Sequence, residues 1–423
     1  VPLTPSQVSE LIAKEGLAFT VQSSTIRAFG DGEYRDAGAE VAADLDNCPV
    51  IFAVKEIPVD VLEKNKTYIY FAHVVKGQAG NMEMLQRLID LDCTLIDYER
   101  ITDEQSRRLI FFGFHAGLAG MIETLWALGQ RLKVDGFNTP LAKVKHAYEY
   151  PDLANVREKL IHIGEEIERD GLPKEITPLV FGVTGYGNVS RGAQDVLTAL
   201  PVKVIEPEEL AGLADRKDLD HSRTMYKVVF REEHTVKPKD LKGKFDLQEY
   251  FTQPEKYVSN FDQYLPHITS LVNCIYWTPK NPRLMTLDWV KEAWAEGNKP
   301  KMSVIGDISC DIGGAVECTT YATNPGAPVY TYIAETGESK EGLEGHGPVL
   351  MTVDNLPCEL PRESSTSFGE ALMPFVAAIA KAGYWAELEE LALPTEIKKA
   401  VIVYNGELTK EYKYLEEYLK QEK

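Results

Sequence analysis

Long apolar runs and clustered metal- or disulfide-forming residues are what this sequence lacks. No stretch approaches the roughly 20 apolar residues of a membrane-spanning helix, and no signal-peptide pattern opens the chain. The six cysteines include no Cys-x-x-Cys pair, and the eight histidines form no His-Glu-x-x-His motif. We therefore expect buried cysteines in a reducing compartment, no metal site and no membrane segment.

Basic residues are also scarce relative to acidic ones. The chain has 45 lysines and arginines against 65 aspartates and glutamates, which gives a formal net charge of −20. This balance disfavours nucleic acid or an anionic membrane as the main partner and favours a soluble protein. The 423 residues suit two domains better than one core.

A glycine-rich turn is the clearest motif. Leu179–Val183 is a short apolar run typical of a buried parallel strand, and a predicted helix begins near Asn188, after Gly185-Tyr186-Gly187. Such a turn lets the backbone approach a pyrophosphate at a helix N-terminus. The third glycine of the usual Gly-x-Gly-x-x-Gly pattern is replaced by Ser190, which is still small. The residues expected to bind a dinucleotide here are Gly185, Tyr186, Gly187, Asn188, Val189 and Ser190.

The next predicted strand, 202–205, ends at Glu206. An acidic residue at this point of a dinucleotide-binding fold holds the ribose hydroxyls. Glu206 therefore favours NAD, because its carboxylate would repel a 2′-phosphate.

Three predicted strands in the first part of the chain end in ionisable side chains. The strands lie at 49–55, 67–74 and 94–99 and alternate with helical segments, which predicts an α/β architecture with a mostly parallel sheet. The carboxyl ends of such strands border the ligand crevice. For any single residue, the simpler interpretation is that a polar side chain occurs where the strand ends and has no function. The ionisable residues at these ends are Lys55, Glu56, His73, Lys76 and Glu99.

The remaining pattern predicts two Rossmann-like domains with parallel sheets. A further buried strand at 107–114 and a long apolar helix at 115–132 come first, and later strands at 268–276, 302–307 and 349–353 place Asp311 and Asn355 at strand ends. The polar stretch 207–267 is either an elaborated insertion, with one strand at 226–231, or a substrate-side flap. A C-terminal helix after Pro361 is expected to complete the first domain. The predicted domains are 1–135 with 362–423, and 136–361.

Many collinear segments resemble one enzyme family over the whole chain. They include VPLTP, AVKEIP, YIYFAHVVKGQAGNM, LIDYERI, RRLIFFGFHAGLAGMI, VTGYGNVSRGAQ, LVNCIYW, ISCDIGG and VDNLPCELPRESS. These segments resemble the lysine–ketoglutarate reductase domain of α-aminoadipic semialdehyde synthase. More distantly, they resemble lysine-forming saccharopine dehydrogenase and the alanine dehydrogenase/transhydrogenase fold.

The resemblance implies that the ε-amine of L-lysine condenses with 2-oxoglutarate and that a nicotinamide reduces the imine to saccharopine. It implies Lys55 and His73 as the acid–base groups, with Glu56, Lys76 and Glu99 tuning them by charge. Arg107 and Arg108 would clamp the 2-oxoglutarate carboxylates, with a structural ion pair as the alternative for one of them. Asp311 and Asn355 would lie on the cofactor side. We expect the nicotinamide to lie against Lys55, His73 and Glu99.

The resemblance also bears on the cofactor and the partners. It favours NADP(H) over NAD(H), in conflict with Glu206, and a base such as Arg191 or one within 227–237 would then neutralise the 2′-phosphate. A glutamate-forming saccharopine dehydrogenase, fused or separate, is the expected partner, and the sequence leaves open whether the chain forms a homo-oligomer. The cytoplasm is the expected location, with the mitochondrial matrix as the alternative.

The start of the chain affects the expected substrate site. The family has an arginine just before the VPLTP-like segment, and this sequence begins one residue too late to show it. We therefore expect a natural start that was processed or lies upstream, in a free-standing reductase or an excised half of a bifunctional enzyme. Two alternatives remain: an alanine dehydrogenase-like enzyme, which would share Lys55 and His73, and a non-catalytic nucleotide-binding subunit.

Overall fold

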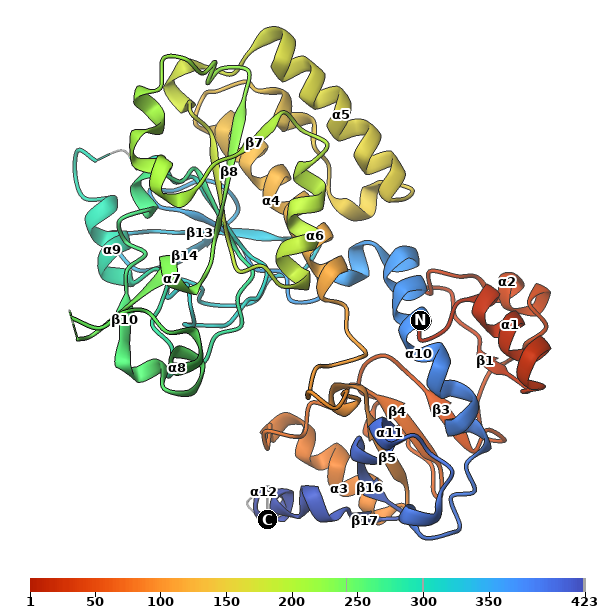
Figure 1. The fold of residues 1–423 in the computed structure, drawn as a ribbon. Coiled ribbons are helices and arrows are strands. Elements are labelled where there is room, and N and C mark those ends of the chain that lie inside the picture. The colour runs from red at the N-terminus through yellow and green to blue at the C-terminus, as the bar shows by residue number, and fades with distance from the viewer. Residues whose placement is uncertain (241, 299, 421–423) are drawn as a thin grey trace. The chain divides into compact units, whose positions relative to one another are not determined.

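The chain divides into two compact units. The computed structural model describes residues 1–240, 242–298 and 300–420. One unit comprises Val1–Phe112 and Pro361–Lys423, and the other comprises Gly113–Leu360 (Figure 1). Both contain sheets rich in parallel strands together with helices, so the α/β fold predicted from the sequence is confirmed.

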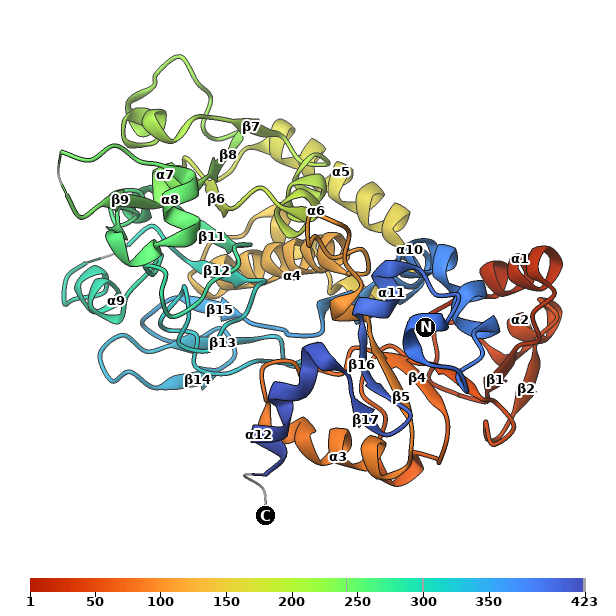
Figure 2. The ribbon, with the colours of Figure 1, turned by 60° about the horizontal axis from the view of Figure 1, so that its bottom comes forward.

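The first unit is built around a five-stranded sheet with the order β17-β16-β5-β4-β3. Strands β3, β4 and β5 are parallel, whereas β16 runs antiparallel to β5 and β17 antiparallel to β16. Figure 2 shows these C-terminal strands beside β4 and β5. The strands are β3 (Val50–Phe52), β4 (Thr67–Tyr70), β5 (Thr94–Asp97), β16 (Val401–Tyr404) and β17 (Glu407–Leu408), and a separate parallel pair is β1 (Thr20–Gln22) and β2 (Glu40–Ala42).

The first helix of this unit has residues at both ends that start and stop a helix. Thr4 caps it by accepting a hydrogen bond from the Gln7 N–H, Pro5 occupies its first turn, and Gly16 ends it with a φ of 66°. The helices are α1 (Pro5–Glu15), α2 (Asp31–Asp36), α3 (Met82–Asp90), α10 (Pro361–Lys381), α11 (Thr395–Lys399) and α12 (Glu416–Leu419). Short 3₁₀ helices are η1 (Val59–Val61), η2 (Ala79–Asn81), η3 (Tyr98–Arg100), η11 (Leu388–Glu390) and η12 (Lys410–Leu415).

The second unit is built around an eight-stranded sheet with the order β14-β13-β15-β12-β11-β6-β8-β7. The strands from β15 to β7 in this order are parallel, and β13 and β14 form an antiparallel edge. The strands are β6 (Val180–Thr184), β7 (Val202–Val204), β8 (Met225–Phe230), β11 (Ser270–Asn273), β12 (Val304–Asp307), β13 (Val329–Tyr332), β14 (Ser339–Glu341) and β15 (Val349–Met351), and β9 (Val236–Pro238) pairs with β10 (Tyr257–Ser259).

This sheet is buried on both faces. Val272 and Val304 belong to one apolar core with helices α4 and α6, whereas the alternate residues Leu271 and Ile305 belong to a second core. The helices are α4 (Gly113–Val134), α5 (Leu153–Asp170), α6 (Asn188–Leu197), α7 (Glu232–Thr235), α8 (Leu247–Thr252) and α9 (Leu287–Ala293). The 3₁₀ helices are η4 (Pro140–Lys143), η5 (Ala147–Glu149), η6 (Lys174–Ile176), η7 (Pro207–Asp215), η8 (Pro254–Lys256), η9 (Leu265–His267) and η10 (Leu356–Glu359).

The boundary between the units differs from the expected one at 135/136, because α4 packs within the second unit. A Cβ atom added to Gly117 would lie 1.9 Å from the carbonyl oxygen of Val189, and one added to Gly192 would lie 2.0 Å from that of Phe114. The backbones of α4 and α6 therefore touch where only glycine fits. Helix α4 therefore belongs to the second unit, which begins at Gly113.

The strand predicted at 107–114 is wrong. The segment makes only an isolated bridge between Thr102 and Arg108, and helix α4 begins already at Gly113. Asp103 organises a turn here, since its Oδ1 accepts hydrogen bonds from the N–H groups of Gln105 (3.0 Å) and Arg107 (2.8 Å). Within this segment Ile110 is buried and Leu109 half-buried, whereas Phe111 is 41% exposed.

The sheet order decides which strand lies beside the glycine-turn strand β6. Strand β8, which lies inside the stretch 207–267, occupies that place, and β7 is the outermost strand. The strand predicted at 226–231 within this stretch is thus confirmed, and it is the second strand from one edge of the sheet.

Candidate active site

The predicted acid–base residues follow the parallel strands of the first unit. Lys55 and Glu56 come shortly after β3, His73 comes after β4, and Glu99 comes after β5. Because these three strands are parallel neighbours, their carboxyl ends lie at one edge of the sheet. The edge thus collects groups from three separate parts of the sequence.

His73 is held by Glu56 and Asn81. Its Nδ1 is hydrogen-bonded to Oε1 of Glu56, and Nδ2 of Asn81 donates to the carbonyl oxygen of His73 (3.2 Å) and to Oε1 of Glu56 (3.4 Å). His73 also has a φ of 48°, in the left-handed region that non-glycine residues rarely adopt. These contacts fix both the backbone and the ring.

The environment favours the ionised form of Glu56. Partial burial acts to raise the pKa of this carboxyl, but the hydrogen bond from His73 and the charges of His73 and Lys55 outweigh it and lower the pKa. Lys55 is exposed and forms no ion pair within the described part of the chain. Its ammonium is thus available to another partner. Lys76 is also exposed, on the turn after His73, where its N–H donates to Oε1 of Gln78 (2.9 Å).

Asp97 is a member of this edge that the sequence analysis missed. Its side chain is fully buried, Oδ1 accepts a hydrogen bond from the Glu99 N–H (2.8 Å), and Oδ2 has no hydrogen-bond partner. Burial raises its pKa to about 6, although the charge of His73 acts in the opposite direction. The available signal was an aspartate inside an apolar run, in the segment Leu95-Ile96-Asp97-Tyr98.

The two predicted substrate arginines are already paired with acids. Arg108 forms an ion pair with Glu99, so the structure brings these two predicted residues together. Arg107 is 77% exposed and pairs with Asp103 across its own turn, at 2.7 Å. The structure thus places Arg108, but not Arg107, beside another predicted site residue.

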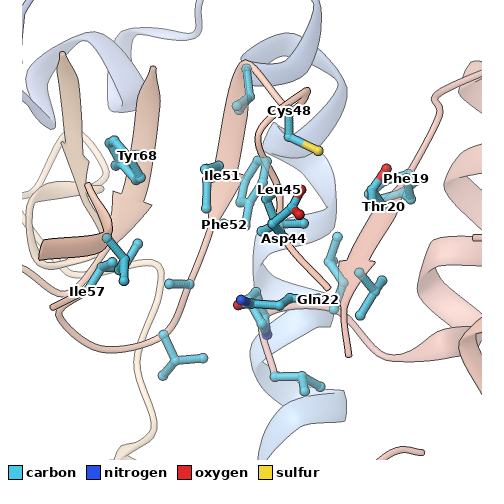
Figure 3. Close-up of a pocket in the computed structure, with 18 of the residues that line it drawn as sticks. Phe19, Thr20, Gln22, Asp44, Leu45, Cys48, Ile51, Phe52, Ile57 and Tyr68 are labelled. Carbon is cyan, nitrogen blue, oxygen red and sulfur yellow. The ribbon is translucent and has the colours of Figure 1, made fainter. Parts of the chain in front are cut away.

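A cavity of about 1310 Å³ opens in the first unit, and Lys55 and Glu56 are part of its lining. Figure 3 shows the part of this cavity around Ile51 and Tyr68. Gln22, Asp44 and Phe52 line it from other segments. Arg27 also lines it, with its guanidinium 4.8 Å from the ring centre of Tyr34. The cavity is large enough for an amino-acid-sized ligand and offers both charge signs.

The glycine turn of the second unit has the geometry of a phosphate site. Strand β6 ends at Thr184, Gly185 has a φ of 83°, and Gly187 precedes α6 without any side-chain cap. A Cβ atom on Gly187 would meet nothing within 4 Å, so the space in front of the helix N-terminus is open. Uncapped N–H groups beside open space suit the pyrophosphate of a dinucleotide.

The first turn of α6 carries the other predicted residues. Asn188 and Val189 begin the helix and are half-buried, and Ser190 is fully buried and accepts a hydrogen bond from Nε2 of Gln194 (2.9 Å). Ser190 thus permits the close packing that the third glycine of the motif provides.

Glu206 does not lie beside this turn. It follows β7, which pairs with β8 and not with β6, so two strand spacings, or about 10 Å, separate it from the glycine strand. The carboxyl end of β8 lies there instead, since the Gly185 N–H donates to the carbonyl oxygen of Phe230 (2.8 Å). The strand-order argument for Glu206 as the ribose-binding residue is therefore lost.

A buried polar network crosses the carboxyl ends of β6, β11 and β12. Asn273 accepts a hydrogen bond from Thr184 Oγ1 (3.1 Å) and donates to Asp307 Oδ1 (2.8 Å), and Thr319 Oγ1 donates to Asp307 Oδ2 (2.6 Å). Burial raises the pKa of Asp307 to about 6 against the lowering effect of the hydrogen bonds from Thr319 and Asn273. Asp311 and Asn355 follow the paired strands β12 and β15, so both lie at this edge; Asp311 is half-buried and Asn355 is exposed.

A second buried acid lies outside the predicted site. Glu359 is 2% exposed, and neither of its carboxyl oxygens has a hydrogen-bond partner in the structure. Burial and the negative charge of Glu123 raise its pKa to about 10. Glu123 is itself fully buried and accepts hydrogen bonds from His146 Nδ1 (2.8 Å) and the Ala147 N–H (2.7 Å).

Among the described residues, no three or more His, Cys, Asp and Glu side chains gather in a way that could hold a metal ion. Nor does any helix in the described ranges have the length and apolar character needed to cross a membrane.

Comparison with protein families gives two matches. Residues 1–119 match the model "Alanine dehydrogenase/PNT, N-terminal domain", and residues 259–411 match "Alanine dehydrogenase/PNT, C-terminal domain".

Curated relatives match nearly the whole chain. Alpha-aminoadipic semialdehyde synthase of Arabidopsis thaliana is 34% identical over 98% of this chain and 40% of its own length, and the mitochondrial protein of that name from Bos taurus is 35% identical over 98% and 46%. The chain thus spans less than half of these relatives. "Saccharopine dehydrogenase [NAD(+), L-lysine-forming]" of Yarrowia lipolytica is 30% identical over 88% of this chain and 86% of its own length.

Solved structures share the fold. An L-alanine dehydrogenase aligns over 100% of this chain and 95% of its own with a TM-score of 0.62 and 18% identity. A transhydrogenase from Sinorhizobium meliloti gives a TM-score of 0.52 with 16% identity, over 97% of this chain and 96% of its own.

Proposed function

The chain belongs to the alanine dehydrogenase/PNT family, and on this premise we propose that it is an NAD(P)-dependent oxidoreductase that condenses L-lysine with 2-oxoglutarate and reduces the imine to saccharopine. The observation that carries the proposal is the match to a lysine-forming saccharopine dehydrogenase over 86% of that enzyme. The alanine dehydrogenase-like alternative has weaker support, because that likeness is one of fold at 18% identity.

The acid–base steps fall to Lys55 and His73. The ε-amine of the substrate must lose a proton before it attacks the keto group, and the carbinolamine must then lose water. Lys55 is unpaired within the described residues and lines the cavity, and in its neutral form its amine takes the first proton. Glu56 holds Nδ1 of His73, which leaves Nε2 to exchange protons with the carbinolamine.

Glu56 and Glu99 act on these groups through charge and position. Glu56 stabilises a protonated His73 by its hydrogen bond, and Glu99 fixes Arg108 at the neighbouring strand end. The guanidinium of Arg108 binds a carboxylate of 2-oxoglutarate, and Lys76 adds positive charge at the same edge. Arg107 keeps a structural role, because its partner Asp103 belongs to the same turn.

The cofactor is a nicotinamide dinucleotide, which supplies the hydride for imine reduction. The residues from Gly185 to Ser190 hold its pyrophosphate, since the open space at Gly187 and the uncapped helix suit such a group. Asp311 and Asn355 lie at the carboxyl ends of neighbouring strands, in position to contact the nicotinamide side. We assign NADP(H) as the preferred form, although the Yarrowia relative's name prints NAD(+).

The product must be consumed by a further oxidation, and a glutamate-forming saccharopine dehydrogenase, fused or separate, is the proposed partner. The cytoplasm is the proposed location. The mitochondrial matrix is the alternative, since the bovine relative is named mitochondrial.

The reaction is tested by NADPH oxidation with lysine and 2-oxoglutarate, offered together and separately. We expect oxidation only when both are present, with saccharopine identified by mass spectrometry. Pyruvate with ammonia is the matched control. Oxidation with that pair and none with lysine and 2-oxoglutarate would replace the proposal by an alanine dehydrogenase-like activity, and oxidation with neither pair, with the cofactor still bound, would favour a non-catalytic nucleotide-binding subunit.

A further inference from the structure

We propose that Arg231, at the carboxyl end of β8, binds the 2′-phosphate of NADP(H) and determines the preference for it over NAD(H). The inference rests on the proposed function only in requiring that the second unit binds a nicotinamide dinucleotide. It identifies the residue that contacts the ribose 2′-phosphate, and this residue follows a different strand from Glu206.

The sheet order brings Arg231 to the glycine turn. In a dinucleotide-binding sheet, the ribose of the adenosine half is read at the carboxyl end of the strand beside the glycine strand. Here that strand is β8, with Thr184 in register with Phe230, so that Gly185 and Arg231 are the next residues along the two strands. The Gly185 N–H donates a hydrogen bond to the Phe230 carbonyl oxygen (2.8 Å), which holds the two strand ends side by side.

The guanidinium of Arg231 is held over the turn by an aromatic contact. It lies 5.4 Å from the ring centre of Tyr186, the middle residue of the Gly-Tyr-Gly turn, in a cation–π contact. Arg231 is exposed and forms no ion pair within the described residues. By contrast, Arg216 pairs with Asp218 at 2.8 Å and Arg223 pairs with Asp220 at 3.5 Å.

Two acids, Glu232 and Glu233, act on the same tyrosine, Tyr186, by their charges. Oε1 of Glu232 lies 3.5 Å from the hydroxyl of Tyr186 and accepts its weak hydrogen bond. An exposed, unpaired guanidinium on an aromatic ring presents its fork of N–H donors to solvent, and this geometry suits the oxygens of a phosphate monoester. The alternative that Arg231 merely covers Tyr186 predicts no difference between the two dinucleotides.

The inference also bears on the conflict over the cofactor. Glu206 follows β7, which lies two strand spacings from the glycine strand but only one spacing, about 5 Å, from β8. The guanidinium of Arg231 must therefore offset the repulsion between the Glu206 carboxylate and the 2′-phosphate.

The test measures binding without turnover. Full-length protein is titrated calorimetrically with NADP⁺ and NAD⁺, and then with adenosine 2′,5′-bisphosphate and 5′-AMP. For the parent we expect tighter binding of the 2′-phosphorylated member of each pair. In Arg231→Gln we expect the Kd for NADP⁺ to rise about 10- to 100-fold, as expected for losing a hydrogen-bonded charge pair, and the Kd for NAD⁺ to change less than about twofold.

Two matched variants and a salt series complete the experiment. Arg216→Gln, an exposed arginine nearer to Glu206, and Arg191→Gln, in the first turn of α6, are both expected to retain the preference. Raising the salt concentration is expected to weaken NADP⁺ binding more in the parent than in Arg231→Gln. Circular dichroism confirms that the exposed substitutions leave the fold intact.

Any of three results overturns the proposal. The first two are equal losses for NADP⁺ and NAD⁺ in Arg231→Gln, and loss of the preference in Arg191→Gln with Arg231→Gln unaffected. Parent protein that binds NAD⁺ at least as tightly as NADP⁺ also overturns it. Because no substrate is present, selective binding without lysine-dependent oxidation would refute the proposed reaction alone.

Discussion

Replacing Asp97 by asparagine is expected to stabilise the first unit at neutral pH while slowing the enzyme. The buried carboxyl has one oxygen without a hydrogen-bond partner, and its pKa is raised from 3.8 to about 6. A raised pKa in the folded state means that stability is fully present below the unfolded-state value and is lost as pH rises towards about 6. The shift of about 2 units corresponds to about 3 kcal/mol that the parent loses between pH 4 and pH 7.

Asparagine cannot ionise, so Asp97→Asn avoids this loss and keeps an oxygen for the Glu99 N–H. We allow about 1 kcal/mol for imperfect packing of the amide. The variant should then be about 2 kcal/mol more stable than the parent at pH 8 and slightly less stable at pH 4. Its turnover should fall, because the negative charge that acts on His73 is gone.

The assay is urea unfolding at pH 4.5, 6 and 8, followed by tryptophan fluorescence, together with NADPH oxidation at pH 8. Asp307→Asn is the control, because Asp307 has a similarly raised pKa but accepts hydrogen bonds at both oxygens from Thr319 and Asn273. An amide there can keep its oxygen for Asn273, but the Thr319 hydroxyl must then accept a hydrogen bond where it donated one, so the gain in stability above pH 6 should be smaller than in Asp97→Asn. Parallel stability–pH curves for the parent and Asp97→Asn would refute the reasoning.

Three further predictions concern other parts of the molecule. The double variant Lys55→Met with His73→Gln should lower turnover by about 1000-fold and leave calorimetric cofactor binding unchanged; near-parent turnover would contradict the assigned acid–base roles. Gly117→Ala should destabilise the second unit by about 3 kcal/mol in thermal unfolding, because its Cβ would overlap a carbonyl oxygen of α6. Gly212→Ala is the control, because no atom lies within 4 Å of the added Cβ there and no positive φ strains the substitution. Glu359→Gln should flatten the loss of stability between pH 6 and pH 9 seen in the parent's unfolding midpoints, because the parent's raised pKa of about 10 makes its stability fall as pH rises through this range.

Local pattern predicted the parts of the fold that local chemistry specifies. The run before Gly185 became β6, the helix began at Asn188 as expected, and the strands ending near Lys55 and His73 were parallel neighbours. Apolar runs bounded by glycine and polar residues carry this information in a short window. The confirmed α/β class follows from the alternation of such runs with helical segments.

The features that the sequence did not predict correctly are of two kinds. Some depend on contacts between residues that are remote in sequence, and others depend on one polar group within an apolar run. Nothing in 202–205 or 225–230 says which strand lies beside β6, so Glu206 was assigned by adjacency in sequence. The segment 107–114 has the composition of a strand, but Asp103 ties it into a turn. Asp97 was read as part of a strand, because its missing hydrogen-bond partner becomes visible only in the folded protein.

Strand β8 has a consequence for trimming this protein. From composition alone, the polar stretch around it would be the first segment to delete in a search for a minimal nucleotide-binding core. Such a deletion would leave β6 at the rim of the sheet with a row of bare backbone donors and acceptors, and exposed rims of this kind recruit other chains. A shortened version should therefore precipitate or self-associate, however well its glycine turn is preserved.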